Sequence, residues 1–309
     1  MILSVSRRTD IPAFYGEWFF NRLKAGEILV RNPINPHKVT KLLVSPDNVE
    51  CIVFWTKDAT RFIKYIEPIQ KMGYNFYFQY TVTSYATDIE NNVPKKEGVI
   101  ESFMNLASII GKDKVIWRYD PILLNQKYTE EYHIQWFNYL CERLQNATEK
   151  CVISFVDSYK FLKEQFAIHE IEEIAEERIY DMASELKVCA DKYNIPLATC
   201  AESIDLSRLG IVHNKCIDNE LIGKILGTEI KYQKDKSQRG ECGCMESREV
   251  GIYASCQHKC AYCYAAKKGL IKEYDVNSPM LCDSLKGDEE ITVYAKKLAL
   301  HKNCQQSLF

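Results

Sequence analysis

This sequence lacks several features that would assign it quickly to a class of protein. It has no strong charge of one sign, because 40 basic residues face 42 acidic ones in a chain of 309 residues. A globally basic nucleic-acid binder is therefore not indicated, although a local basic patch can still exist. No apolar stretch reaches the ~18 residues that a membrane span needs, and no internal repeat or low-complexity tract is present. With 46% hydrophobic and 27% charged residues, the composition is typical of an ordinary globular protein.

Several motifs of common enzymes are also missing. The sequence has no Gly-rich phosphate-binding loop, no H-E-x-x-H zinc helix and no G-x-S-x-G nucleophile turn. The first residues reach Arg7 and Arg8 before an apolar run of signal-peptide type can form. We therefore expect a cytoplasmic protein in a reducing environment, where clustered cysteines more often bind metal or react than form disulfides.

The first two thirds of the chain alternate β-rich apolar runs with amphipathic stretches. Strands are expected at Ile2–Ser6, Cys51–Trp55, Phe76–Thr83, Lys114–Arg118, Cys151–Val156 and Pro196–Cys200, and helices at about 15–25, 59–72, 97–111, 129–147 and 160–193. This alternation is typical of parallel β/α units. Six such strands before residue 205 predict an α/β fold with a full or partial TIM-like (β/α) barrel. A doubly wound open sheet is the competing architecture.

The composition changes after about residue 228. Between residues 231 and 272 the chain has nine Lys or Arg and four Asp or Glu, which is a local excess of five positive charges. We therefore divide the chain into a barrel-like domain, residues 1–230, and a cysteine-rich segment, residues 231–309, that packs on the barrel.

Polar residues follow the predicted strands in a consistent series. Active sites of β/α barrels are built at the carboxyl ends of the strands, so these residues are candidates for binding or catalysis. The candidates for catalysis are Arg7, Arg8, Asp10, Lys57, Arg118 and Asp120, and those for cofactor binding are Gln79, Thr81 and Glu202. The alternative is that the strands simply leave the core there, and that Arg118 and Asp120 pair with each other.

The chain has 13 cysteines, and five of them fall in the 22 residues from 242 to 263. Cys256, Cys260 and Cys263 have the spacing C-x3-C-x2-C. A short loop of this kind can place three thiolates around one face of a 4Fe–4S cluster, whereas zinc sites typically use two separated pairs of ligands. Three ligands would leave one iron open to an external ligand.

Some of the remaining cysteines could be further metal ligands, and others are expected only to pack in the core. Cys242 or Cys244 could supply a fourth thiolate and close the cluster, the pair could bind a second metal, and a zinc site is a third alternative. His258 lies inside the loop and is expected to be a spacer or hydrogen-bonding residue. The others expected to be small packing residues are Cys51, Cys141, Cys151, Cys189 and Cys200, whereas Cys216, Cys282 and Cys304 are unassigned.

The loop resembles that of the radical S-adenosylmethionine (SAM) enzymes, in which an aromatic residue, here Tyr262, also precedes the last cysteine. The C-x-H-x-C-x-Y-C-Y-A run at 256–265, the R-x-D-P-I at 118–122 and the F-W-T-K at 54–57 resemble the spore photoproduct lyase and DNA repair photolyase branch. The S-R-R-T-D-I-P-A-F-Y at 6–15, the F-Q-Y-T at 78–81 and the terminal cysteines resemble an uncharacterised prokaryotic domain-of-unknown-function family. That second likeness covers nearly the whole chain.

The resemblance implies a cofactor, a chemistry and a rearranged fold. In the superfamily the open iron chelates SAM, and an electron from the cluster cleaves it to a 5′-deoxyadenosyl radical. Tyr262 then joins the cofactor-binding candidates, ferredoxin or flavodoxin would be the reductant, and nucleic acid is a candidate substrate. The superfamily loop follows the first barrel strand, so its place here implies a circularly permuted barrel. The alternatives are a closed four-cysteine electron-transfer or structural cluster without SAM, and a zinc-stabilised nucleic-acid-binding module.

Overall fold

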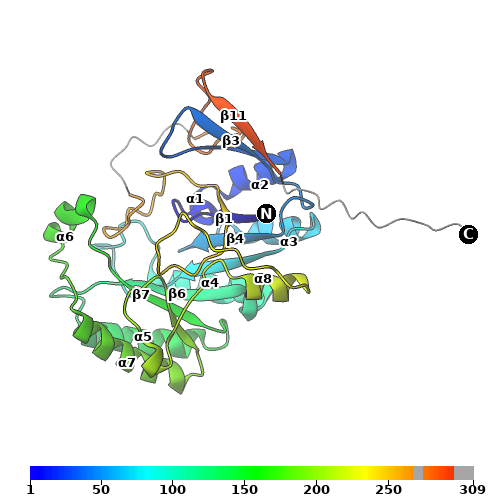
Figure 1. The fold of residues 1–309 in the computed structure, drawn as a ribbon. Coiled ribbons are helices and arrows are strands. Elements are labelled where there is room, and N and C mark those ends of the chain that lie inside the picture. The colour runs from blue at the N-terminus through cyan, green and yellow to red at the C-terminus, as the bar shows by residue number, and fades with distance from the viewer. Residues whose placement is uncertain (267–273, 296–309) are drawn as a thin grey trace, which may run out of the picture.

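The centre of the structure is a large parallel sheet (Figure 1). The computed structural model describes residues 1–266 and 274–295 of the chain. The strands of this sheet are β1 (Ile2–Val5), β4 (Cys51–Thr56), β5 (Phe76–Thr81), β6 (Val115–Ile122), β7 (Cys151–Phe155), β8 (Leu197–Thr199), β9 (Val212–His213) and β10 (Arg248–Glu249). They lie in the order β10-β1-β4-β5-β6-β7-β8-β9, and all neighbours are parallel.

The sheet is open, so a TIM-like barrel is not confirmed. None of the sheets formed by residues 1–266 and 274–295 closes on itself. The two edge strands, β9 and β10, contain only two residues each, and such short strands offer few backbone groups with which to close a ladder. The structure confirms the coarser prediction of an α/β fold with a parallel sheet.

The six strands expected from the sequence are all present. The largest difference is in β6, which continues to Ile122, four residues beyond its expected end at Arg118. Strands β9 and β10 were not predicted because each is too short to show a periodic pattern.

Two of the observed helices, at 11–14 and 219–226, were not predicted, and one predicted stretch is divided. The helices are α1 (Ile11–Phe14), α2 (Gly16–Ala25), α3 (Ile63–Lys71), α4 (Lys96–Ile110), α5 (Glu130–Leu144), α6 (Lys163–Ile168), α7 (Glu176–Lys192) and α8 (Asn219–Leu226). The single stretch expected over 160–193 is wrong, because α6 and α7 are separated by a segment in which Glu170 has φ 50°. No helix in the described part of the chain is long and apolar enough to cross a membrane.

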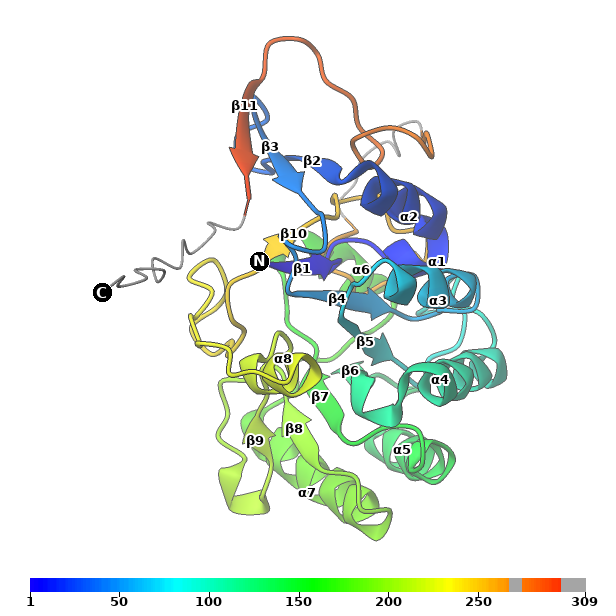
Figure 2. The same cartoon turned by 90° about the vertical axis from the view of Figure 1, so that its right-hand side faces the viewer.

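The two faces of the sheet pack against different layers. Alternate residues of a strand point to opposite faces, so Phe54 packs in the main core with the helices, whereas Val53 belongs to a second core with Ile222 of α8 and Met245. Figure 2 shows α8 on the other side of the sheet from α4 and α5. We call the face with Val53 and α8 the inner face. The segment 214–246 covers it, a role that the sequence did not predict.

A second sheet joins two distant parts of the chain. It contains β2 (Glu27–Arg31), β3 (Lys38–Leu43) and β11 (Glu290–Tyr294) in the order β11-β3-β2. Strand β11 is mostly exposed, and none of the three strands of this sheet was predicted. The cysteine-rich segment thus contributes β10 to the large sheet and β11 to the small one.

Gly251 allows the chain after β10 to pass close to the chain after β1. A Cβ at this position would lie 1.8 Å from Ser6 Oγ and 2.6 Å from Ser6 Cβ. The Ser6 hydroxyl already accepts hydrogen bonds from the amides of Arg8 and Thr9, so it cannot turn away without losing them. The packing therefore requires glycine here.

We expect Gly251→Ala to lower the free energy of unfolding by about 1–3 kcal/mol, the usual cost of overpacking. Urea denaturation measures this change. The matched control is Gly98→Ala on α4, where nothing lies within 4 Å of the added Cβ and where alanine favours the helix by about 0.5–1 kcal/mol. An unchanged midpoint for Gly251→Ala would contradict the close approach.

Candidate functional site

The segment with the C-x3-C-x2-C motif, residues 256–263, lies at the carboxyl edge of the large sheet, and we call it the cysteine loop. Because β10 is parallel to β1, the chain leaves both strands at the same edge. The phenol of Tyr264 donates to the carbonyl of Arg7, 2.8 Å away, and the phenol of Tyr15 donates to the carbonyl of Ser255, 2.6 Å away. The loop after β10 therefore lies against the segment after β1, although about 250 residues separate them.

Asp10 connects this loop to the sheet. Its Oδ1 accepts hydrogen bonds from the amide of Ala13 (3.0 Å) and from Thr56 Oγ1 (2.8 Å). Its Oδ2 accepts from the amide of Lys57 (2.7 Å) and faces Nε2 of His258 at 2.9 Å. One buried carboxylate thus caps α1, orients the end of β4 and holds the cysteine loop.

His258 is a hydrogen-bonding residue of the loop, in agreement with its sequence prediction. Its ring is 2% exposed and packs edge-on against Phe14, with ring centroids 4.6 Å apart. Nδ1 lies 3.3 Å from the carbonyl oxygen of Asn92, and the amide of Asn92 donates to the His258 carbonyl. These contacts position the backbone between Cys256 and Cys260.

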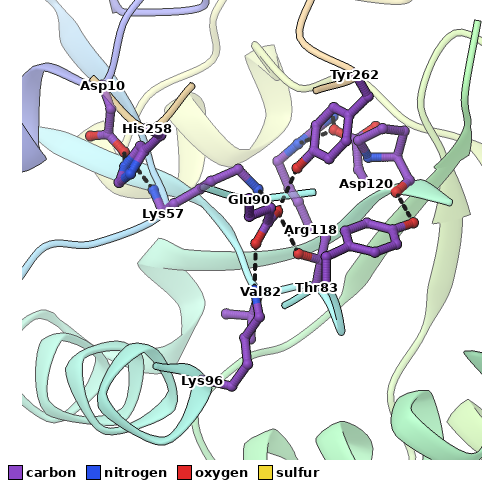
Figure 3. Close-up of polar contacts among 12 residues, drawn as sticks. Asp10, Lys57, Val82, Thr83, Glu90, Lys96, Arg118, Asp120, His258 and Tyr262 are labelled. Carbon is purple, nitrogen blue, oxygen red and sulfur yellow. Dashed lines mark hydrogen bonds and ion pairs between the residues drawn. The ribbon is translucent and has the colours of Figure 1, made fainter. Parts of the chain in front are cut away.

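Glu90 is the centre of a buried charged network that the sequence did not predict (Figure 3). Its Oε1 accepts hydrogen bonds from Lys57 Nζ (2.8 Å), Thr83 Oγ1 (2.7 Å) and the phenol of Tyr262. Its Oε2 forms an ion pair with Lys96. Burial by itself would raise the pKa of Glu90, but the two ammonium groups lower it below its ordinary range. The carboxylate is therefore held in its charged form.

The segment that carries Glu90 pairs directly with the cysteine loop. Glu90 and Cys260 form an antiparallel β-bridge, and the amide of Ala261 donates to the carbonyl of Ile89 at 2.9 Å. Glu90 lies neither at a strand end nor in a motif, and its loop pairs with residues 170 positions away. Sequence patterns within one segment contain no signal for such a contact.

The three thiols of the loop lie within electrostatic reach of one another. Burial, Asp10 and Cys263 together raise the pKa of Cys256 to about 12. Burial also raises the pKa values of Cys260 and Cys263, whereas the nearby Lys57 ammonium lowers both. In the part of the chain that the structure describes, no three His, Cys, Asp or Glu side chains are arranged as a metal site.

Arg118 and Asp120 pair with each other, which was the alternative to substrate binding. Arg118 Nε lies 3.1 Å from Asp120 Oδ2, and Ser154 donates to Oδ1. Burial would raise the pKa of Asp120, but Arg118 and Ser154 lower it overall. The guanidinium also lies over the ring of Trp55, 5.2 Å from its centroid.

The other predicted site residues lie around this pair at the carboxyl edge or on the inner face. Arg7 also lies over the ring of Trp55, 5.5 Å from the ring centroid, whereas Arg8 lies over the ring of Tyr253. Gln79 Nε2 donates to the carbonyl of Cys216. Thr81 pairs with Arg118 in the ladder between β5 and β6.

Cys242 and Cys244 lie with a different pair of cysteines. The thiol of Cys244 interacts electrostatically with those of Cys216 and Cys242, and the Sγ atoms of Cys216 and Cys200 are 3.5 Å apart. Of the cysteines expected to be packing residues, Cys51, Cys141 and Cys151 are buried, and Cys189 and Cys200 are half-buried. Cys304 lies outside the described residues.

One family model covers the region built around this site. The model described as "Domain of unknown function (DUF1848)" matches residues 2–265. The chain belongs to this family. The DUF1848 region includes every strand of the large sheet and the whole cysteine loop. Neither the comparison with curated proteins nor the one with solved structures found a match.

Glu202 supplies a pH-dependent group to the DUF1848 site. One carboxylate oxygen accepts a hydrogen bond from the amide of Phe155 at 2.8 Å. Burial raises the pKa of this carboxyl to about 7, although the Phe155 amide opposes the change. The group thus binds its proton more tightly in the folded protein than at its ordinary pKa of 4.5.

We expect the Glu202 carboxyl to make the protein less stable as pH rises from about 4.5 to about 7. Below that window both the folded and the unfolded states are protonated, and within it only the folded state retains the proton. Glu202→Gln keeps the acceptor oxygen and removes the titration. Chemical denaturation across this pH range should show the variant gaining stability relative to the wild type as pH rises. A constant difference would contradict the assignment.

Proposed function

We propose that this DUF1848 protein is an iron–sulfur enzyme of the radical SAM type, acting on a substrate still to be identified. Cys256, Cys260 and Cys263 would hold a 4Fe–4S cluster. The observation that carries the proposal is that the C-x3-C-x2-C loop lies at the carboxyl edge of a parallel sheet, where α/β proteins bind their ligands. When bound, such a cluster supplies one electron to SAM at its open iron.

The donor set suits an iron–sulfur cluster. The three thiols interact electrostatically with one another, and thiolates in a short loop are the usual ligands of such clusters. Lys57 is the charged group that most lowers the pKa of Cys260. Its ammonium favours the thiolate form that binds metal.

The place of the loop supports a permuted relation to the radical SAM barrel. In our proposal β10 takes the role of the first strand of that barrel, since it lies at one edge of the sheet beside β1. The loop that follows then faces the carboxyl ends of the other strands. This arrangement is compatible with a partial barrel.

The contacts of the other cysteines favour an open iron. Cys242 and Cys244 interact with Cys216 and Cys200, so their thiols are engaged away from the loop. We therefore propose a cluster with three protein ligands. The role of this chain's own residues is to orient the loop, through His258 on Asp10 and through Tyr262 on Glu90.

The test is analysis of protein purified without oxygen. We expect about four iron and four sulfide per chain, as a 4Fe–4S cluster requires, and an electron paramagnetic resonance signal after reduction. Adding SAM should change that signal. Zinc in place of iron would contradict the cluster, and a cluster signal that SAM leaves unchanged would contradict the open iron.

A further inference from the structure

Four cysteines from distant parts of the chain form a row on the inner face. The Sγ atoms of Cys200 and Cys216 are 3.5 Å apart. Cys244 interacts electrostatically with both Cys216 and Cys242, and the amide of Ile217, the residue next to Cys216, lies 3.4 Å from Cys244 Sγ. We call these four residues the cysteine row. None of them belongs to the cysteine loop.

The backbone around the cysteine row is built to hold this order. The amide of Ile217 donates to Cys244 Sγ at 3.4 Å, and the amide of Met245 donates to the Ile217 carbonyl at 3.0 Å. A Cβ at Gly243 would lie 3.2 Å from the carbonyl oxygen of Asn214. The segment 242–245 therefore packs against the segment 214–217, which places Cys244 beside the backbone that follows Cys216.

The two end cysteines of the cysteine row are partly exposed to solvent, whereas the two in the middle are buried. Cys216 is 1% and Cys244 is 3% exposed, whereas Cys200 and Cys242 are half-buried. The described residues contain no group of three thiols that converges on one metal position. Neighbouring sulfurs in a line favour reactions between sulfurs over coordination of a single ion.

Two polar groups act on the sulfur in the middle of the row. Arg118 donates a hydrogen bond to Cys216 Sγ at 2.7 Å, and Asn214 Nδ2 donates at 3.3 Å. Cys200 and Arg118 lower the pKa of Cys216, but Cys244 and burial raise it more, so that it lies above its ordinary value. The thiolate that Arg118 favours is the attacking form in disulfide exchange. At the exposed end, the hydrogen bond from Cys244 lowers the pKa of Cys242 to about 7, although burial opposes it.

We propose that the cysteine row is a thiol–disulfide exchange site that is oxidised at Cys242 by a low-molecular-weight disulfide and stores the oxidation as a Cys200–Cys216 disulfide. This activity is independent of the proposed cluster chemistry. It requires neither iron nor SAM.

The exchange balances in atoms and electrons. The Cys242 thiolate attacks the external disulfide RSSR, forming a mixed disulfide and releasing RSH. Cys244 then attacks the Cys242 sulfur, releasing the second RSH. Cys216 attacks Cys244, and finally Cys200 attacks Cys216, each step returning a proton to the sulfur that leaves. In sum, two cysteine thiols are oxidised and one RSSR is reduced to two RSH.

The test uses the full reduced chain and oxidised glutathione, without oxygen. After quenching with N-ethylmaleimide, peptide mapping should show a Cys200–Cys216 disulfide and the loss of about two free thiols per chain, as one disulfide requires. We expect Cys242→Ser to slow this oxidation about tenfold or more, because the remaining thiols are less accessible or less ionised. The matched control, Cys189→Ser, changes a half-buried cysteine on α7 and should leave the rate unchanged.

Three results would overturn the proposal. One is complete alkylation of Cys200 and Cys216 after exposure to oxidised glutathione. Another is an equal rate for Cys242→Ser and wild type, and this variant keeps Cys200 and Cys216 intact. The third is a tightly bound zinc ion that is lost when Cys216 is replaced. Iron analysis of the same samples tests the cluster separately, so the two proposals can fail independently.

Discussion

Replacing Cys256, Cys260 or Cys263 singly with Ala is expected to remove the iron from protein purified without oxygen. Each cysteine would hold one iron of the cluster, and a loop left with two thiolates cannot retain a 4Fe–4S group whose fourth iron has no protein ligand. The measurement is iron and sulfide content together with the charge-transfer absorbance of the cluster. The expected effect is a loss of nearly all bound iron.

Two sets of controls make this result specific. Cys141→Ala changes a buried cysteine of α5, so it should leave the iron content unchanged. Cys242→Ala and Cys244→Ala should also retain iron, since those thiols belong to the cysteine row. Retention of the cluster in all three loop variants would contradict the ligand assignment, and loss of iron in Cys244→Ala would favour a closed cluster.

Glu90→Gln is expected to cost the protein about 3–5 kcal/mol of stability, because removing one partner of a buried ion pair leaves uncompensated charge. Glu90 is 1% exposed, and its two ion-pair partners are the ammonium groups of Lys57 and Lys96. The amide keeps the shape of the side chain and loses the charge. Urea denaturation at neutral pH measures the difference.

The same variant makes a prediction about pH. The folded-state pKa of Glu90 lies below its ordinary value of 4.5, so its contribution to stability is complete above pH 4.5 and falls as the pH falls below it. The gap between wild type and Glu90→Gln should therefore shrink in acid. Glu67→Gln is the control, because Glu67 also pairs with a lysine, Lys71, but both side chains are exposed. A comparable loss of stability in both variants would contradict the buried network.

The strands show which parts of the fold can be predicted from local sequence patterns. Cys51–Thr56 and Cys151–Phe155 consist mainly of apolar residues, and such runs were recognised without any knowledge of their partners. The exposed β11 and the two-residue β10 have no pattern of this kind. Strand β10 forms one edge of the large sheet, beside β1. Because β10 could not be recognised in the sequence, neither the strand order at this edge nor the openness of the sheet could be predicted.

The candidate site shows the same division. The strand-end position of Asp10, Lys57 and Arg118 was visible in the sequence, since all three follow runs that end at one edge of a parallel sheet. The partners of Asp10 and Lys57 were not visible there. Asp10 meets His258, and Lys57 meets Glu90, and each partner belongs to a loop whose path depends on the whole chain.

The sequence by itself determined the α/β class, the six main strands and a cysteine loop with the spacing of an iron–sulfur ligand set. These are local properties, because side-chain periodicity and ligand spacing act over a few residues. Only the tertiary structure decided that Glu90 lies beneath the loop and that Cys242 and Cys244 lie with Cys200 and Cys216. Contacts between residues so far apart depend on how the loops close over the sheet, and no pattern within one segment specifies that path.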